Sequence, residues 1–141
     1  MVRMGHLHDL MVEIQKIGAM LLVHSEDDDM VQHMYQKLAK DEQTEWYNMH
    51  LVHSNESEDV SFRRVVRVAE WTGAPVYFVH VSAKQGLEAI QEARAKGMPI
   101  YGEALHKYPC FACDQSAAAN ATKPPTRPPI TPVEPTLAVW H

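Results

Sequence analysis

Apolar residues recur every three or four positions near the start of the chain, which is the spacing of one face of an α-helix. The residues that share this spacing are Leu7, Leu10, Met11, Ile14 and Ile17. Gly18 follows the last of them and predicts the end of the helix, because glycine readily adopts the left-handed backbone found at helix C-termini.

Three short, mostly apolar runs predict strands, namely AMLLVH at 19–24, VYFVHV at 76–81 and MPIYGEA at 98–104. Further helices are expected at 27–40, from Val60 to the TGAP sequence at 72–75, and at 84–96, with a polar connection over 41–59. The predicted order is α-β-α-α-β-α-β. Apolar strands that alternate with helices are typical of a parallel sheet with right-handed crossovers and helices on both faces, so the predicted class is α/β.

The composition changes near residue 115, which divides the chain into two parts. Residues 116–141 hold six of the nine prolines and show no apolar periodicity, so we expect an unstructured, Pro-rich tail. The whole chain of 141 residues is shorter than a complete (β/α)₈ barrel, which takes about 250 residues. Residues 1–115 are therefore expected to form a partial α/β unit with about three parallel strands and flanking helices.

Charge and cysteine content exclude several classes of protein. The net charge is -5 and the basic residues are scattered, which argues against nucleic acid and against an anionic membrane surface. No apolar run is long enough to span a bilayer. The two cysteines cannot staple a small secreted fold, so we expect a cytoplasmic protein. Cys110 and Cys113 form a C-x-x-C spacing, but neither a thioredoxin-like unit nor a second ligand pair accompanies it, so a redox or zinc role is a minor alternative.

Polar residues that could carry chemistry stand at the ends of the predicted strands, where parallel α/β proteins place their functional sites. These residues are His24, His80 and Glu103. A single histidine at a strand end is more commonly a core or capping residue. Two histidines on neighbouring strands would lie side by side, and this arrangement suits a divalent metal ion as much as a purely structural role.

The strings LLVHSEDDD, AEWTGAPVYFVHVSAKQGLEAI and GMPIYGEALHKY resemble, in the same order, the central part of the cyclic amidohydrolases of the dihydropyrimidinase and D-hydantoinase family. The resemblance covers about residues 3 to 113. It implies strands five to seven of a (β/α)₈ (TIM) barrel, which in the family holds two divalent metals, usually zinc, bridged by a carboxylated lysine and a hydroxide. The family hydrolyses cyclic amides, opening dihydropyrimidine or hydantoin rings.

The resemblance assigns His24 and His80 as ligands of one metal ion, with His24 on the fifth strand and His80 on the sixth. Glu103 falls on the seventh strand, where the family has a glutamate without a catalytic role. Ser25 and Asp27 depart from the more common Ala and Asn of the family. No catalytic residue is assigned, because the aspartate of the eighth strand would lie outside the matched stretch.

The family's first-strand His-x-His pair and bridging lysine would also lie outside it, so two of six expected site residues are present. The spelling GHLHD offers His6 and His8, but they open a helical stretch and are expected to cap or flank a helix. The chain is thus expected to be an incomplete fragment that is inactive alone, holds zinc weakly and forms homo-oligomers through its open sheet edges. The alternative is a non-catalytic α/β remnant that acts through subunit contacts.

Other charged residues have simpler explanations. Asp27, Asp28 and Asp29 could support a metal ion by contacting its ligands, but capping of the helix that follows is preferred. Arg63, Arg64 and Arg67 are expected on a solvated helix face, and Met30, Met34 and Leu38 on a core-facing one.

Overall fold

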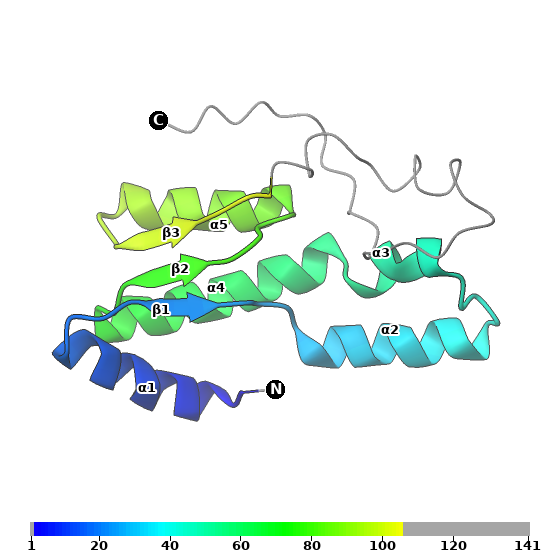
Figure 1. Cartoon of the computed structure of the whole chain (residues 1–141), viewed down its shortest axis with the longest axis horizontal. Coiled ribbons are helices and arrows are strands. Elements are labelled where there is room, and N and C mark those ends of the chain that lie inside the picture. The colour runs from blue at the N-terminus through cyan, green and yellow to red at the C-terminus, as the bar shows by residue number, and fades with distance from the viewer. Residues whose placement is uncertain (1, 106–141) are drawn as a thin grey trace.

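A computed structural model of the chain describes residues 2–105, which form a mixed α/β structure (Figure 1). The predicted order of helices and strands is confirmed, with two additional short helices in the segment predicted as a polar connection. The elements are α1 Met4–Lys16, β1 Leu21–Val23, α2 Asp28–Lys40, η1 Trp46–Asn48, α3 Met49–Val52, α4 Asn55–Thr72, β2 Val76–Phe78, α5 Lys84–Ala95 and β3 Ile100–Gly102. The predicted tail at 116–141 and the pair Cys110 and Cys113 lie outside the described residues.

The three strands form one parallel sheet in the order β1-β2-β3. Leu22, Tyr77 and Tyr101 occupy equivalent positions across it. Each strand is shorter than the apolar run that predicted it, but hydrogen bonds between strands continue beyond the strand ends. The N–H of Val79 donates to the carbonyl of Val23, and the N–H of Glu103 donates to the carbonyl of Phe78. The sheet therefore guides the backbone as far as the residues that follow each strand.

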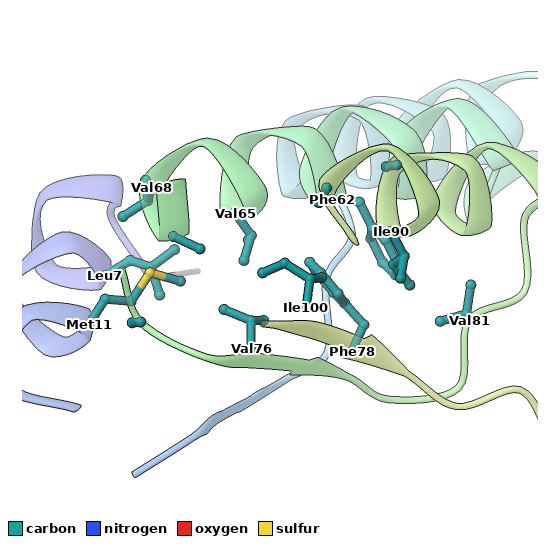
Figure 2. Packing of buried hydrophobic residues seen from close by; sticks show 14 residues of the cluster. Leu7, Met11, Phe62, Val65, Val68, Val76, Phe78, Val81, Ile90 and Ile100 are labelled. Atoms are coloured by element: carbon teal, nitrogen blue, oxygen red, sulfur yellow. The ribbon is translucent and has the colours of Figure 1, made fainter. Parts of the chain in front are cut away.

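The helices α1, α4 and α5 pack on one face of the sheet and form the main core with it (Figure 2). Val76, Phe78 and Ile100 point from the strands toward α4 and α5. The ring of Phe78 stacks on that of Phe62 from α4, with ring centroids 4.0 Å apart and planes at 16°. Burial of these apolar side chains is the main source of stability for a fold of this size.

The opposite face of the sheet is uncovered in the part of the chain that the structure describes. Leu22 is 66% exposed and Tyr101 is 41% exposed, and Tyr77 between them is partly exposed. The prediction that helices cover both faces is therefore wrong for residues 2–105. Successive side chains of a strand point to opposite faces, and apolar character alone does not tell which of the two faces a helix covers.

Two details of the helices differ from the prediction. Helix α4 begins at Asn55 rather than near Val60, because the Ser54 hydroxyl caps it by accepting the N–H of Ser57. Val60, with which the predicted helix began, lies inside α4 and is 41% exposed. The predicted stop of α1 is confirmed, since the helix ends at Lys16 and Gly18 has a φ of 66°.

Helices α2 and α3 extend past the carboxyl ends of the strands, as Figure 1 shows. They form a second, smaller apolar cluster of Val31, Leu38 and Val52, with Met34 packed against it. Of the predicted core-facing residues of α2, Leu38 is buried, whereas Met30 is only partly buried. The helices α2 and α3 thus lie beside the edge of the sheet at which the strands end. Within the described residues, no helix is long and apolar enough to cross a membrane.

Candidate metal centre

The imidazoles of His24 and His80 meet at the carboxyl edge of the sheet. His24 directly follows β1, and His80 lies just beyond the end of β2. The Nδ1 atom of His24 and the Nε2 atom of His80 are 3.0 Å apart, and the ring centroids are 4.8 Å apart. The expected juxtaposition of two strand-end histidines is therefore present, although 56 positions separate them in the sequence.

His80 has a backbone conformation that only a few non-glycine residues adopt. Its φ is +44°, in the left-handed region. For a residue with a Cβ atom this conformation costs about 1 to 2 kcal/mol, and it persists where the surroundings hold it in place. The next residue is held by the residue that follows β3, since the N–H of Val81 donates to the carbonyl of Glu103 at 2.7 Å.

Glu26 and His53 complete a polar cluster around the pair. The Nδ1–H of His53 donates to the Glu26 carboxylate, with distances of 2.9 and 3.1 Å to its two oxygens. The Nε2 atom of His24 lies 3.3 Å from the same carboxylate. Because an ionised carboxylate only accepts hydrogen bonds, Nε2 of His24 carries the proton. Nδ1 of His24 is then free of its own proton in the neutral ring and faces His80.

The same contacts shift the pKa values of Glu26 and His24. Burial acts to raise the pKa of Glu26, but the hydrogen bonds from His24 and His53 outweigh it and lower this pKa to about 2. The hydrogen bond to Glu26 raises the pKa of His24 above its usual value, against the opposing effect of burial. Glu26 is thus a permanent anion beside the histidine pair near neutral pH.

Glu26 and His53 were not predicted from the sequence. Glu26 stands two positions after His24, and this spacing was the available signal, because alternate residues of an extended chain project to the same side. No such signal exists for His53, which comes from the end of α3. Its other ring nitrogen, Nε2, accepts a hydrogen bond from the hydroxyl of Tyr35 on α2, at a distance of 3.2 Å between the two atoms.

Glu103 follows β3, as predicted, and its carboxylate accepts a hydrogen bond from the Tyr77 hydroxyl at 3.1 Å. Asp27 is the N-cap of α2, and its side chain accepts the N–H of Met30. The predicted capping role of Asp27 is therefore confirmed. His6 and His8 lie in α1 and are exposed, which agrees with the expectation that they accompany a helix.

The three arginines predicted on a solvated helix face all form ion pairs. Arg64 donates to the Asp27 carboxylate at 2.7 Å, Arg63 bonds to Asp59 and Glu92, and Arg67 bonds to Glu70. The positive charge of this helix face is therefore neutralised locally.

The fold and the position of the site are those of the parallel α/β class of proteins. Helices cross over between parallel strands on one side of a sheet, and acid–base side chains gather at the carboxyl edge, which is where parallel α/β enzymes build their active sites. In residues 2–105, no three His, Cys, Asp or Glu side chains are grouped so as to hold a metal ion. The site described here therefore offers an imidazole pair with a supporting carboxylate.

Comparison with known proteins identifies the relatives of this α/β chain. It is 33% identical over 112 residues to the D-hydantoinase of Geobacillus stearothermophilus, a match that covers 79% of the chain and 23% of that enzyme. It is 34% identical over 80 residues to the D-hydantoinase of Streptomyces coelicolor, covering 55% of the chain and 17% of that enzyme. No family model matches the chain.

Solved structures agree with the sequence relatives. The D-hydantoinase of Bacillus sp. AR9 matches with a TM-score of 0.78 and 26% identity over 80% of the chain and 25% of that protein. The D-hydantoinase (dihydropyrimidinase) of Thermus sp. matches with a TM-score of 0.79 and 26% identity over 82% of the chain and 25% of that protein. The chain is therefore related to the cyclic amidohydrolases of the hydantoinase and dihydropyrimidinase group, and it spans about a quarter of the length of these relatives.

Proposed function

We propose that this chain supplies part of a metal-dependent site for the hydrolysis of cyclic amides, with His24 and His80 as two ligands of one divalent metal ion. The observation that carries the proposal is the separation of 3.0 Å between Nδ1 of His24 and Nε2 of His80 at the edge of the sheet. The D-hydantoinase relatives support the class of substrate, a ring that contains an amide bond.

The donor atoms suit zinc, the metal expected from the resemblance. Zinc binds imidazole nitrogen at about 2.0 to 2.1 Å with tetrahedral geometry, so two nitrogens on one ion lie about 3.3 Å apart. The two histidine nitrogens need to separate by only a few tenths of an ångström to reach this distance. Glu26 accepts a hydrogen bond from the opposite nitrogen of His24, and such a carboxylate partner commonly orients a metal-binding histidine.

A divalent metal ion bound there would polarise the amide carbonyl and lower the pKa of water to about 7. The chain's own residues hold and orient the imidazoles, and Glu26 keeps the proton of His24 on Nε2. Catalytic zinc sites take three protein ligands, and the described residues offer no group of three. We therefore expect the 141-residue chain on its own to bind zinc weakly and to turn over dihydrouracil or hydantoin only at trace rates.

In this proposal, β1, β2 and β3 correspond to strands five to seven of a (β/α)₈ barrel within a unit at 1–115, followed by the Pro-rich segment at 116–141. The uncovered sheet face, with Leu22 and Tyr101 exposed, is consistent with a face that lines a barrel interior.

Zinc titration by calorimetry tests the assignment of the ligands. We expect the unmodified chain to bind one zinc ion, and His24→Ala and His80→Ala each to weaken binding at least tenfold. His8→Ala is the matched control, because His8 is an exposed histidine of α1 in the sequence GHLHD. Absence of zinc binding by the unmodified chain, or equal binding by all variants, would favour the alternative of a non-catalytic remnant that acts through subunit contacts.

We also propose that copies of the chain associate through the outer edge of β1. Leu21 and Val23 direct their backbone hydrogen bonds to β2, so the N–H and carbonyl of Leu22 point away from the sheet. A cavity of about 480 Å³ lies beside this edge, lined by Leu10 and Leu22 among others. Light scattering should show a dimer or larger species. A monomer at high concentration would contradict this proposal without affecting the zinc assignment.

A further inference from the structure

The carboxylate of Glu58 binds the backbone that leads into helix α5, beginning at Ser82, 24 positions further along the chain. Glu58 is in the first turn of α4 and is only 6% exposed. It accepts the N–H of Ser82 at 3.1 and 3.2 Å, the hydroxyl of Ser82 at 2.6 Å and the N–H of Ala83 at 2.9 Å. A buried carboxylate with several donors of this kind fixes the backbone that supplies them.

Helix α5 lacks a cap of its own. Its N-cap residue is Ala83, which has no side-chain acceptor, and no acidic residue lies in its first turn. The N–H groups at the start of a helix need acceptors, and a negative charge is favourable there. Glu58 supplies both across the space between α4 and α5, so the start of α5 is anchored by α4 rather than by its own sequence.

Glu58 also restrains the segment that carries His80. This histidine stands two residues before Ser82 and has the left-handed φ of +44°. On one side, the N–H of Val81 is bound to the carbonyl of Glu103, and on the other side Ser82 and Ala83 are bound to Glu58. With the carboxylate removed, residues 80–83 would be free to relax toward the ordinary backbone conformation, and the His80 ring would change its direction relative to His24.

Gly86 leaves the room that the carboxylate needs. A Cβ atom at this position would overlap Oε1 of Glu58 and would approach the ring of Phe62 to 3.2 Å. Substitution by alanine therefore displaces the Glu58 carboxylate from its donors and also presses on the Phe62 ring, while α5 gains a residue that favours helix. Gly86→Ala is thus a second way to disturb the same contact without removing the acid.

We propose that Glu58 is a positioning residue that holds residues 80–83 so that the imidazole of His80 faces that of His24. The consequence for zinc rests on the proposed function, but the geometry of the two rings does not. Glu58 contacts neither imidazole and acts through the backbone of Ser82 and Ala83.

Two measurements on the full chain test this role. The first uses metal-free protein and follows nuclear Overhauser effects between the His24 and His80 ring protons, which the centroid distance of 4.8 Å makes observable. The second is zinc affinity. Ser54→Ala is the matched control, because it removes a cap at the same end of α4 without touching residues 80–83.

We expect Glu58→Ala and Gly86→Ala to abolish the nuclear Overhauser effects between the two rings. Both substitutions should also weaken zinc binding about 10- to 100-fold, as loss of a supporting contact commonly does. Glu58→Gln should recover part of both, because its amide oxygen still accepts the N–H of Ala83. Ser54→Ala should change neither. Adding Glu58→Ala to His80→Ala should cause no further loss of zinc affinity.

Preserved ring contacts in Glu58→Ala and Gly86→Ala would overturn the inference, as would equal losses in Ser54→Ala. If Glu58→Ala does not fold, Gly86→Ala decides the matter with Glu58→Gln. If the unmodified chain binds no zinc but the ring contacts still depend on Glu58, then the proposed function fails and the positioning role stands.

Discussion

Asp27 makes two different contacts through one carboxylate, and the contribution of each to stability can be measured separately. One oxygen, Oδ1, accepts the N–H of Met30 at 3.1 Å and caps α2. The other oxygen, Oδ2, accepts from the Arg64 guanidinium at 2.7 Å and ties α2 to α4. The substitution Asp27→Asn would retain an acceptor for the cap and lose the charge, whereas Asp27→Ala would remove both. Comparison of the two substitutions therefore distinguishes the cap from the ion pair.

The magnitudes follow from burial. Loss of an N-cap costs about 1 kcal/mol. The side chain of Asp27 is 9% exposed, but that of Arg64 is 43% exposed, so water competes for the guanidinium. An ion pair of this type contributes at most about 1 kcal/mol. We therefore expect Asp27→Asn to lower the free energy of unfolding by about 1 kcal/mol and Asp27→Ala to lower it by about 2 kcal/mol.

Urea unfolding followed by circular dichroism measures both values, and a double-mutant cycle with Arg64→Ala isolates the pair. In the Asp27→Asn background, Arg64→Ala should cost almost nothing further. Equal destabilisation by Asp27→Asn and Asp27→Ala would show that the cap contributes nothing. A full additive cost of Arg64→Ala in the Asp27→Asn background would show that the ion pair is not the source of the effect.

Three further predictions concern the metal-free protein, each measured by the free energy of unfolding. Because the pKa of Glu26 is lowered from 4.5 to about 2, its carboxylate stabilises the fold above pH 4.5, and this contribution is lost as the pH falls toward 2. Glu26→Gln should reduce this loss of stability at low pH by about 1 to 2 kcal/mol, since its partner His24 is exposed to solvent. An equal fall of the free energy of unfolding with pH in Glu26→Gln and in the unmodified chain would refute the prediction. Phe62→Ala removes the buried ring stacked on Phe78 and should cost about 3 to 5 kcal/mol, whereas a loss below about 1 kcal/mol would contradict the buried stack. Gly73→Ala, at a φ of 72°, should cost about 1 kcal/mol, whereas Gly5→Ala in α1, where nothing crowds a Cβ atom, should not destabilise.

The sequence predicted the elements whose causes are local. Periodic apolar residues predicted α1, and an apolar run predicted β2. The start of α4 was missed, because SNESED is polar and was interpreted as a connection, although Ser54 followed by acidic residues is a recognisable helix start. Which face of the sheet the helices cover could not be predicted in this way, because the residues of an apolar strand such as β1 do not indicate the side on which helices pack.

Some residues of the candidate site could likewise be predicted from the sequence, and others could not. His24 and His80 could be found from the sequence, because parallel strands bring their carboxyl ends to one edge and each histidine follows an apolar run. His53 and Glu58 could not be found, since each acts on a partner that is distant in the chain. The resemblance to cyclic amidohydrolases, now supported by the D-hydantoinase relatives, assigned the histidine pair but not these supporting residues.

The two histidines of the pair depend on different parts of the fold. His24 directly follows β1, and its orientation is set by the sheet and by the carboxylate of Glu26 two positions away. His80 lies beyond β2 in a strained conformation, where hydrogen bonds between strands alone do not determine where its ring points. Its position requires acceptors from β3 and from α4, which meet at residues 81–83. Changes in the contact between α4 and α5 should therefore alter His80 while leaving His24 in place, and the affinity for metal should respond to that contact more than to the exposed helix faces.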